Sequence, residues 1–314
     1  MTSGWPHDHS PFHSGEQKIQ AELELRDEVE ARARKIIRDY MPEQHQQFFA
    51  SLSYVFLAVE QENEECYLIC AYGEPGFVSA SNSNTLVISK KYWFTPKSEN
   101  HFSSGQKLGL VGLNFSNRRR NRLNGTIADI TETEITMTVD QSFGNCPKYI
   151  QQREALFSAE NTTQAVPTRN KELPQLLARA DTFFIATCHH DKNNAYASGV
   201  DVSHRGGKPG FIRLVDNTMT FPDFRGNRHF STLGNLLLNP KVSLLFIDFE
   251  LERTVRAQGE ASILWSKDTY GEFEGAERFV QIILNQDSVI TEKLPIHWSD
   301  KQDSPFIEDT GVWE

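Results

Sequence analysis

The sequence predicts a mainly β protein with peripheral helices (α+β), arranged as two tandem copies of one small β-domain. The 314 residues exceed the usual length of a single domain, so two domains with full cores are expected. A motif at residues 73–77 (GEPGF) returns 134 positions later at residues 207–211 (GKPGF), and the run at 110–115 (LVGLNF) matches 244–249 (LLFIDF) at the same spacing. A constant spacing of this kind indicates an internal duplication.

The duplication continues through a charged stretch, but only the second copy is rich in residues that bind anions. Two arginines and a glycine recur in order at the same spacing: Arg119, Arg122 and Gly125 match Arg253, Arg256 and Gly259. A duplicated half that has diverged favours a pseudo-dimer, in which one half carries a ligand and the other supplies the opposite wall.

The first domain is expected over residues 1–165. A capping box at residues 14–17 (SGEQ) and apolar residues at helical spacing predict one helix to about Tyr40, packed on this domain. Runs rich in β-branched and aromatic residues, separated by turn residues, predict strands. These strands are expected at residues 54–59, 66–71, 85–89, 108–115, 124–130 and 134–139.

The second domain is expected over residues 166–314, after a boundary near residues 162–168 where polar residues surround Pro167. Helical patterns are found before and after this boundary, and the last of them is amphipathic. Helices are predicted at residues 152–157, 172–180, 227–238 and 276–285 (AERFVQIILN). Strands are predicted at residues 182–188, 195–203, 210–215, 218–221, 242–249 and 254–264.

Composition excludes several classes of protein. The net charge of −10 and the pI of about 5.5 argue against a nucleic-acid partner, which requires a basic face to neutralise phosphates. The chain starts without a signal-peptide pattern and has no apolar run of about 18 residues, so we expect a cytoplasmic protein without a membrane partner. The four cysteines are too scattered for a disulfide framework and are expected to be reduced.

Three histidines near the start, His7, His9 and His13, stand among Pro, Ser and Gly. They fit either a disordered arm or a metal site. The arm is favoured, because ligands on a mobile tail have no fixed geometry. We therefore expect no metal.

Candidate ligand-binding residues concentrate between Asp201 and Asn239. A phosphate needs cationic forks, small residues for close backbone approach and free amides at a helix N-terminus, where Asn227 and Arg228 are predicted to lie. The alternative is a solvated basic face, but the first repeat lacks the matching Gly-Asn-Arg and Leu-Gly-Asn elements, which favours a ligand. The basic residues around these glycine-rich turns are His204, Arg205, Lys208, Arg213, Arg225, Arg228 and His229.

The strand end formed by Phe221, Pro222 and Asp223 could line a planar aromatic ring. Asn227 or Asn235 would then satisfy the polar edge of the ring. The stretch therefore suits a ligand that combines a phosphate with a ring system.

These residues resemble those of the FMN-binding split β-barrel proteins related to pyridoxamine 5′-phosphate oxidase. The similarity extends over nearly the whole chain and includes the runs SPFHSGE, RDYMPEQHQQFF, GEPGF, RRRNRLNG and FGNCPKYIQ, followed by HRGGKPGF, GNRHFSTLGN and LLFIDFE. It is closest to a two-barrel subgroup. The resemblance implies two tandem FMN-binding split β-barrels, with FMN held mainly by the second barrel and the first barrel and its CPKY segment as a lid.

The resemblance also assigns roles to individual positions. It places Ser198, Asp201 and Ser203 along the flavin, and Arg228 and His229 where the oxidase has a Ser-Arg-Lys phosphate clamp. Thr254 lies in a run (RTVR) that parallels a segment near the flavin of the oxidase. The expected cofactor-binding residues are Ser198, Asp201, Ser203, His204, Arg205, Phe221, Pro222, Asp223, Asn227, Arg228, Thr232, Asn235, Lys148 and Tyr149.

The function implied by the resemblance is that of a flavoprotein oxidoreductase using flavin-mediated electron transfer, with NAD(P)H as a candidate electron donor. The oxidase grips its vitamin substrate with an Arg-x-His element near its end, whereas this chain has no arginine after Arg278, so we do not expect oxidation of pyridoxamine phosphate. The alternatives are a non-catalytic flavin or haem carrier and a barrel that serves as an oligomerisation module. No catalytic residue is assigned, and a homodimer is left open.

Two further features of the sequence each allow two interpretations. The run at residues 118–122 (RRRNR) either binds an anion across the barrel interface or faces solvent. Cys146 is either a reactive thiol beside Lys148 or a structural cysteine next to a proline turn, and the second is favoured.

Overall fold

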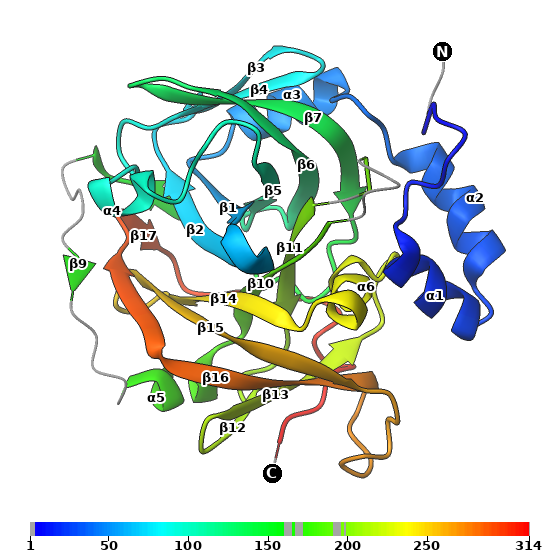
Figure 1. Cartoon of the computed structure of the whole chain (residues 1–314). Helices are drawn as coiled ribbons and strands as arrows, with labels where there is room; N and C mark the ends of the chain where they lie inside the picture. The colour runs from blue at the N-terminus through cyan, green and yellow to red at the C-terminus, as the bar shows by residue number, and fades with distance from the viewer. Residues whose placement is uncertain (1–3, 160–164, 167–171, 191–195, 198, 314) are drawn as a thin grey trace.

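The computed structural model describes residues 4–159, 165–166, 172–190, 196–197 and 199–313, and its core consists of two antiparallel sheets (Figure 1). The first sheet has the strand order β2-β1-β5-β6-β7-β4-β3. Its strands are β1 (Tyr54–Glu60), β2 (Cys66–Tyr72), β3 (Val78–Asn82), β4 (Thr85–Ser89), β5 (Lys107–Asn114), β6 (Arg119–Ile130) and β7 (Glu134–Asn145). All six strands predicted for this half are present, and only the polar edge strand β3 was missed.

The second sheet repeats this order with the strands β11-β10-β14-β15-β16-β13-β12. The short strand β9 (Ala165–Val166) adds to β16 and is the only described part of the expected domain boundary. The other strands are β10 (Thr182–His189), β11 (Gly199–Gly206), β12 (Arg213–Val215), β13 (Thr218–Phe224), β14 (Lys241–Asp248), β15 (Arg253–Leu264) and β16 (Ala276–Lys293). The expected mainly β fold with two similar halves is thus confirmed.

Two of the repeated glycines show why the duplicated motif is kept in both halves. A Cβ atom on Gly125 would collide with the carbonyl oxygen of Thr138, and a Cβ on Gly259 would collide with that of Ile283. In each sheet the glycine lies where two long strands change register. The repeat therefore preserves a close backbone approach that only glycine permits.

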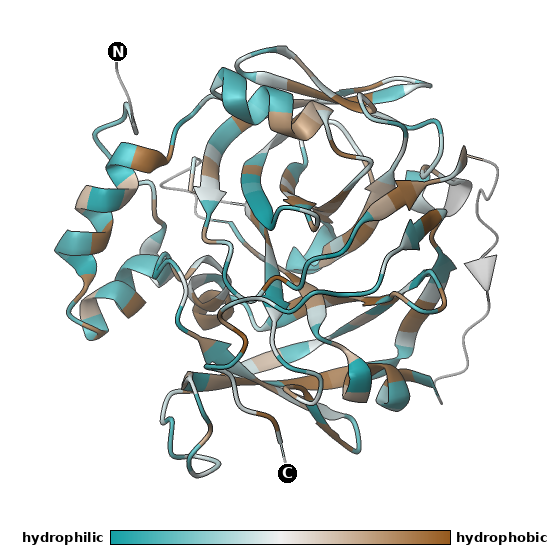
Figure 2. Cartoon of the chain, turned by 180° about the vertical axis from the view of Figure 1, so that it is seen from behind, coloured by the Kyte–Doolittle hydropathy of each residue, from teal (hydrophilic) through white to brown (hydrophobic). Residues whose placement is uncertain are grey.

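The two sheets share one core. Phe56 on β1 and Phe184 on β10 stack with their ring centroids 3.5 Å apart. These two residues occupy equivalent places, because Phe56 pairs with Val111 and Phe184 pairs with Leu245, which lies 134 positions after Val111. The stacked rings mark the contact between the two halves, and the apolar residues in Figure 2 lie mainly on the strands around it.

The helices lie at the periphery and differ from the expectations in several places. The N-terminal helix predicted to reach Tyr40 is two helices, because Glu24 takes a left-handed conformation (φ 56°) and reverses the chain. Helix α3 was not predicted. The helices are α1 (Ser14–Glu22), α2 (Arg26–Ile36), α3 (Glu43–Ala50), α4 (Pro96–Glu99), α5 (Leu173–Arg179) and α6 (Ser231–Leu238), with a 3-10 turn η1 (Glu62–Glu64).

Two predicted helices are strands. Residues 276–285 form the start of β16, where pairing with β13 and β15 on both sides overrides helix propensity. Residues 152–157 contain the strand β8 (Ala155–Phe157), which pairs with β17 (Ile296–Trp298) near the C-terminus. Both corrections depend on strand partners that are far away in the sequence.

No helix in the described part of the chain has the length and apolar character needed to cross a membrane.

Candidate cofactor pocket

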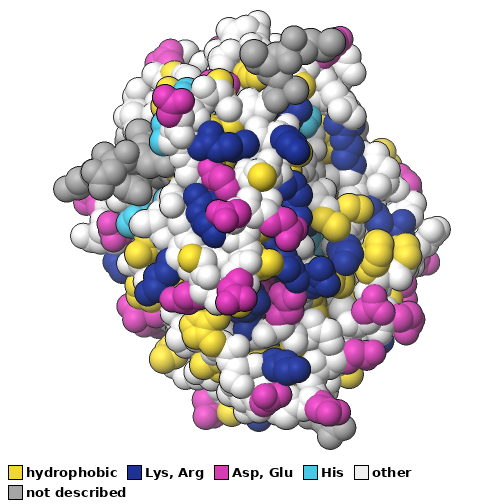
Figure 3. Space-filling view, turned by 90° about the vertical axis from the view of Figure 1, so that its right-hand side faces the viewer, with side chains coloured by type: hydrophobic (Ala, Val, Ile, Leu, Met, Phe, Trp, Pro, Cys, Tyr) yellow, Lys and Arg dark blue, Asp and Glu magenta, His cyan; other side chains and the backbone are white. Residues whose placement is uncertain are grey.

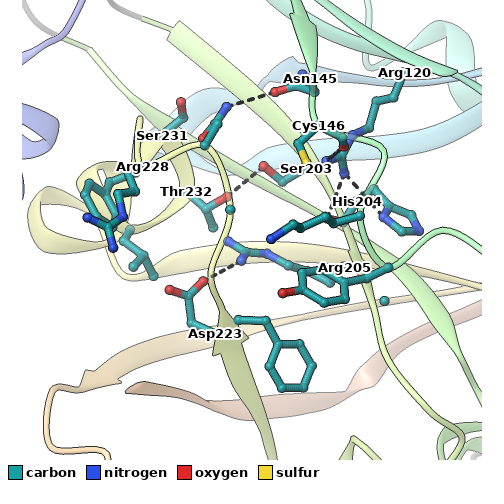
Figure 4. Close-up of a pocket in the computed structure, with 18 of the residues that line it drawn as sticks. Arg120, Asn145, Cys146, Ser203, His204, Arg205, Asp223, Arg228, Ser231 and Thr232 are labelled. Carbon is teal, nitrogen blue, oxygen red and sulfur yellow. Dashed lines mark hydrogen bonds and ion pairs between the residues drawn. The ribbon is translucent and has the colours of Figure 1, made fainter. Parts of the chain in front are cut away.

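A pocket of about 880 Å³, including its open mouth, lies where the two halves meet (Figure 4). The first half lines it with β6 and with the segment that follows β7. The second half contributes β11, the end of β13 and the start of α6.

Ten of the fourteen residues expected to bind a cofactor line this pocket. The strand β11 extends to Gly206, three residues beyond the predicted strand, and so carries His204 and Arg205 into the pocket as well as Ser203. The ten residues are Ser203, His204, Arg205, Pro222, Asp223, Asn227, Arg228, Thr232, Lys148 and Tyr149.

The other four expected residues do not line the pocket. Ser198 lies outside the described residues. Asp201 is buried behind the pocket, where it forms an ion pair with Arg122 at 2.7 Å. Phe221 is fully buried in the second core, and Asn235 donates hydrogen bonds to Thr187.

Arg120 and Arg122 on β6 line the pocket, and the sequence alone left their role open. These two residues reach across the barrel interface to β11, as in the first of the two interpretations of residues 118–122. Arg118 and Arg119 instead donate to backbone carbonyls elsewhere, those of Ile150 and Gln44. Thr254 was expected near the flavin but does not line the pocket, and its hydroxyl donates to the Glu292 carbonyl at 3.5 Å. The strand that lies beside β11 at the pocket is β6 and not β15.

Sequence reasoning missed several lining residues, which include Asn145, Phe224, Phe230, Ser231, Leu233 and Glu277. Cys146 also lines the pocket, and its carbonyl accepts a hydrogen bond of 2.6 Å from Arg120. Asn145 and Cys146 reach the pocket through the contact between the two halves, and Glu277 comes from β16. The other four residues belong to the run between Asp201 and Asn239 but were not singled out in it.

The pocket is positively charged although the whole chain carries a net charge of −10. Five of its lining residues are basic, namely Arg120, Arg122, Lys148, Arg205 and Arg228, and two are acidic, Asp223 and Glu277. Burial, followed by the nearby Arg122, lowers the pKa of Arg120 to about 9. Because a guanidinium stays charged in proteins at neutral pH, the low pKa means that its surroundings do not fully compensate this charge.

Several donors in the pocket have no partner. Among the described residues, nothing accepts a hydrogen bond from the buried Nε of Arg120 or the buried Nε of Arg205, and the buried Nε2 of His204 is also unpaired. Burial, followed by Arg120 and Arg205, lowers the pKa of His204 well below its usual value, so this ring is neutral. Buried polar groups are normally paired, so these atoms indicate a missing ligand.

The helix α6 begins at Ser231, four residues later than predicted, because Arg228 (φ 63°) and Phe230 (φ 65°) have left-handed backbones. No side chain caps its N-terminus, and its first residues line the pocket. The free backbone amides of the helix N-terminus therefore lie at the start of α6, from Ser231 on, and not at Asn227 as expected. An uncapped helix N-terminus is a favourable place for an anion.

Behind the lining residues, a network of polar side chains fixes the shape of the pocket. Arg205 forms an ion pair of 2.6 Å with Asp223, which also binds Arg278 at 2.9 Å. Thr232 donates to the Ser203 hydroxyl at 2.9 Å, and Ser203 donates to Asp201 at 3.0 Å. The cationic wall is thus held in place before any ligand binds.

His229, expected where the oxidase has its phosphate clamp, does not line the pocket. Its ring is buried between Phe12 and Phe143, with centroid distances of 5.3 and 5.6 Å. Burial lowers its pKa to about 3, so it is neutral. Arg228 alone of this pair reaches the pocket, where it lies 3.7 Å from Glu277.

The pseudo-symmetric counterpart of the pocket is closed. Tyr67 stands in the place of Asp201, and the guanidinium of Arg256 lies over its ring at 4.6 Å. The ring of His101 stacks on the ring of Tyr67, with the two centroids 3.7 Å apart. Cys70 and Ala71 occupy the positions of His204 and Arg205, so these two basic side chains are present in only one of the two places.

The three N-terminal histidines also have defined positions. His7 and His9 stack on each other and on Tyr196, with centroid distances of 4.3 to 5.4 Å. His13 caps α1 by accepting a hydrogen bond from Gly15, while Glu16 accepts one from the His13 amide. The capping box therefore begins one residue earlier than expected, and the described part of this segment is ordered against the protein.

Glu16 is a buried acid behind the pocket and gives a prediction about pH. Burial raises its pKa to about 8, against hydrogen bonds from the His13 amide and Ser231 that lower it. The folded protein therefore keeps a proton that the unfolded chain loses above about pH 4.5, so the contribution of Glu16 to stability falls as pH rises from about 4.5 to 8. We expect Glu16→Gln to match the native protein at pH 5 and to be more stable by a few kcal/mol (~1.4 per pKa unit) at pH 8.5.

Urea unfolding at pH 5 and pH 8.5 checks this prediction. Asp216→Asn, at an exposed turn, serves as a control for a general effect of charge. Equal stability of Glu16→Gln and the native protein at the higher pH would contradict the assignment of Glu16 as a protonated acid.

The fold and the pocket together define a class of protein: a tandem β-barrel with a cationic pocket between its halves. Residues 170–298 match a family model described as pyridoxamine 5′-phosphate oxidase. The second half of the chain is thus similar to the split barrels of this family, and the first half has the same sheet order. A search of the curated proteins found no match.

Among solved structures, similar chains each match about one barrel. HupZ of Group A Streptococcus is 16% identical, with a TM-score of 0.28, and the match covers 38% of this chain and 90% of that one. A FAD-binding protein of Mesorhizobium loti is 15% identical, with a TM-score of 0.28 and coverage of 44% and 99%. An F420 reductase is 16% identical, with a TM-score of 0.25 and coverage of 44% and 100%.

Proposed function

We propose that the pocket binds FMN and that the protein is an FMN-dependent oxidoreductase. The observation that carries this proposal is the pair of buried Nε donors of Arg120 and Arg205, which have no acceptor among the described residues, beside the uncapped N-terminus of α6. This arrangement suits a phosphate. Similarity to the pyridoxamine 5′-phosphate oxidase family supports a flavin as the rest of the ligand.

The residues of the pocket fit both parts of FMN. The guanidinium groups of Arg120 and Arg205 and the amides of α6 would hold the phosphate. The side chains of Tyr149 and Phe224, whose ring centroids lie 5.3 Å apart, offer apolar surface to a planar ring. The hydroxyl groups of Ser203 and Thr232 provide polar contacts between these two regions.

Bound FMN would supply hydride or single-electron transfer, with NAD(P)H as a candidate donor. The protein would hold the cofactor and keep water from it. Tyr149 can act here as a hydrogen-bond donor, because burial raises the pKa of its hydroxyl to about 12 and this group donates to the Arg225 carbonyl. We do not propose oxidation of pyridoxamine phosphate, because the segment after Arg278, in which Trp313 packs on Phe279, contains no arginine.

Titration of the purified protein with FMN and with riboflavin tests the proposal. We expect one FMN per chain, because the counterpart of the pocket is closed by Tyr67 and Arg256. We expect FMN to bind at least about tenfold more tightly than riboflavin, since the phosphate forms charge-assisted hydrogen bonds of about 1.5–3 kcal/mol each. The preference for FMN should shrink as the salt concentration rises.

The absorption spectrum then separates the alternatives. Flavin bands that bleach when NADH or NADPH is added without oxygen would support an oxidoreductase. Bands that never bleach would favour the flavin carrier. Absence of FMN binding, or equal affinity for riboflavin, would contradict the assignment of the pocket.

A further inference from the structure

The segment before the first barrel lies against the loop that forms one wall of the pocket. This loop, residues 226–230, leads into the free N-terminus of α6. It has a costly backbone, because Arg228 and Phe230 both have positive φ angles, and a non-glycine residue in this region costs about 1 kcal/mol or more. Such a conformation persists only when surrounding groups hold it.

Side chains of α1 and α2 hold this loop from behind. Gln20 donates a hydrogen bond of 3.1 Å to the carbonyl of His229, and Arg32 donates one of 2.6 Å to the carbonyl of Asn227. These two carbonyls flank Arg228. The N-terminal segment therefore fixes the backbone on both sides of Arg228, whose side chain lies near Glu277 in the pocket.

The two helices are docked at close range on both halves of the protein. A Cβ atom on Gly15 would collide with the Gly234 carbonyl, and a Cβ on Gly234 would lie 2.6 Å from the Glu16 amide nitrogen, so α1 and α6 touch through their backbones. Val29 and Ala33 of α2 share a buried cluster with Phe143 on β7. The helices thus bridge the two barrels, whereas the sequence predicted packing on the first barrel alone.

The helices do not contribute to the pocket itself. None of the described residues of α1 and α2 lines it. Their outer face carries interspersed positive and negative side chains, as expected for a solvated surface (Figure 3). They also lie outside residues 170–298, the part of the chain that matches the family model.

We infer that α1 and α2 are a positioning element for the pocket: Gln20 and Arg32 hold the loop at residues 226–230 in its binding conformation, and thereby set the affinity for a phosphate-bearing ligand. The free amides of α6 follow this loop directly, so a change in the loop displaces them. Preorganised groups bind more tightly because the cost of ordering them is already met. The inference rests on the proposed function only for the identity of the ligand.

The test compares Arg32→Ala with Lys35→Ala. Both residues are exposed on α2 and both substitutions remove one positive charge, but within the described structure only Arg32 contacts the loop. We expect Arg32→Ala to weaken FMN binding about five- to tenfold, the scale of one ordinary hydrogen bond, because Arg32 acts through the loop and not on the ligand. Lys35→Ala should bind FMN like the native protein, and Arg32→Lys, which keeps a donor, should recover part of the loss.

A second measurement does not need FMN. In the ligand-free protein, hydrogen exchange at the amides of Ser231, Thr232 and Leu233 should be several-fold faster in Arg32→Ala than in Lys35→Ala. Exchange in β5 should be equal in the two variants. Gln20→Ala, which frees the other carbonyl, should act in the same direction.

The outcomes separate the inference from the proposed function. If the native protein does not bind FMN but exchange at α6 responds to Arg32→Ala, the ligand is wrong and the positioning role stands. If FMN binds to the native protein, and Arg32→Ala and Gln20→Ala match Lys35→Ala in both affinity and exchange, the positioning role is refuted.

Discussion

Replacing Arg122 by alanine should lower the free energy of unfolding by about 3–5 kcal/mol, because it leaves a buried carboxylate without its cation. Arg122 forms an ion pair of 2.7 Å with Asp201 and donates to Ser203 at 2.6 Å. The side chains of Arg122 and Asp201 are only 6% and 5% exposed. The pair also crosses from β6 of the first barrel to β11 of the second, so its loss should weaken the contact between the halves.

The internal duplication provides a matched control. Arg256 occupies the same place in the second barrel, but its partner Glu292 is 34% exposed and lies 3.3 Å away. Water can solvate Glu292 once Arg256 is removed, so we expect Arg256→Ala to cost about 1–2 kcal/mol, from the ion pair and from the contact with Tyr67. Urea unfolding of both variants measures the difference.

A double variant separates loss of the pair from loss of volume. Arg122→Met combined with Asp201→Asn removes both charges and keeps most of the side-chain volume. This variant should recover most of the lost stability, since replacing a whole buried pair by neutral groups is often nearly neutral. Equal losses in Arg122→Ala and Arg256→Ala would contradict the view that burial makes the first pair special.

Replacing Arg120 by methionine should weaken FMN binding about 10- to 100-fold, the equivalent of one charge-assisted phosphate contact of about 1.5–3 kcal/mol. The stability of the ligand-free protein should change little. The variant loses the hydrogen bond from Arg120 to the Cys146 carbonyl, but it also removes a cation whose pKa is lowered to about 9 by burial and by Arg122. The two effects on stability oppose each other.

Arg119→Met is the control for this prediction. It removes the same charge from the neighbouring position, where Arg119 lies over the Phe48 ring and contacts the Gln44 carbonyl, away from the pocket. Fluorescence titration with FMN and thermal unfolding without it give both quantities for each variant. If Arg119→Met weakened binding as much as Arg120→Met, the effect would come from the net charge of the protein and not from a contact in the pocket.

The sequence allowed prediction of the fold wherever a local pattern was sufficient. Runs of β-branched and aromatic residues located most strands, and the constant spacing of 134 residues, as between Gly125 and Gly259, indicated the duplication. The pattern failed for residues 276–285 and for 152–157, which were predicted to be helices. These segments are strands because of partners such as β13, β15 and β17, which no local window contains.

The site was predicted mainly from the second half of the chain, with only Lys148 and Tyr149 from the first, and this limited the result. Residues of β11 and the start of α6 were found, because His204, Arg205 and Thr232 belong to one dense run. The role of Arg120 and Arg122 in the opposite wall was one of two interpretations, because a charged run of this kind can equally well face solvent. Glu277 and Phe224 gave no signal at all before the pocket was assembled.

The sequence by itself determined that the protein is a duplicated β protein and that its second half carries the anion-binding residues, because duplication and composition are written along the chain. Only the tertiary structure showed which residues of the first half form the opposite wall of the pocket, that Arg120 and not Thr254 lines it, and that α1 and α2 contact its loop. The physical reason is that these features depend on how two similar sheets pack. Periodicity and spacing encode which face of a strand is buried, but they do not encode which strand of the other half comes to lie against it.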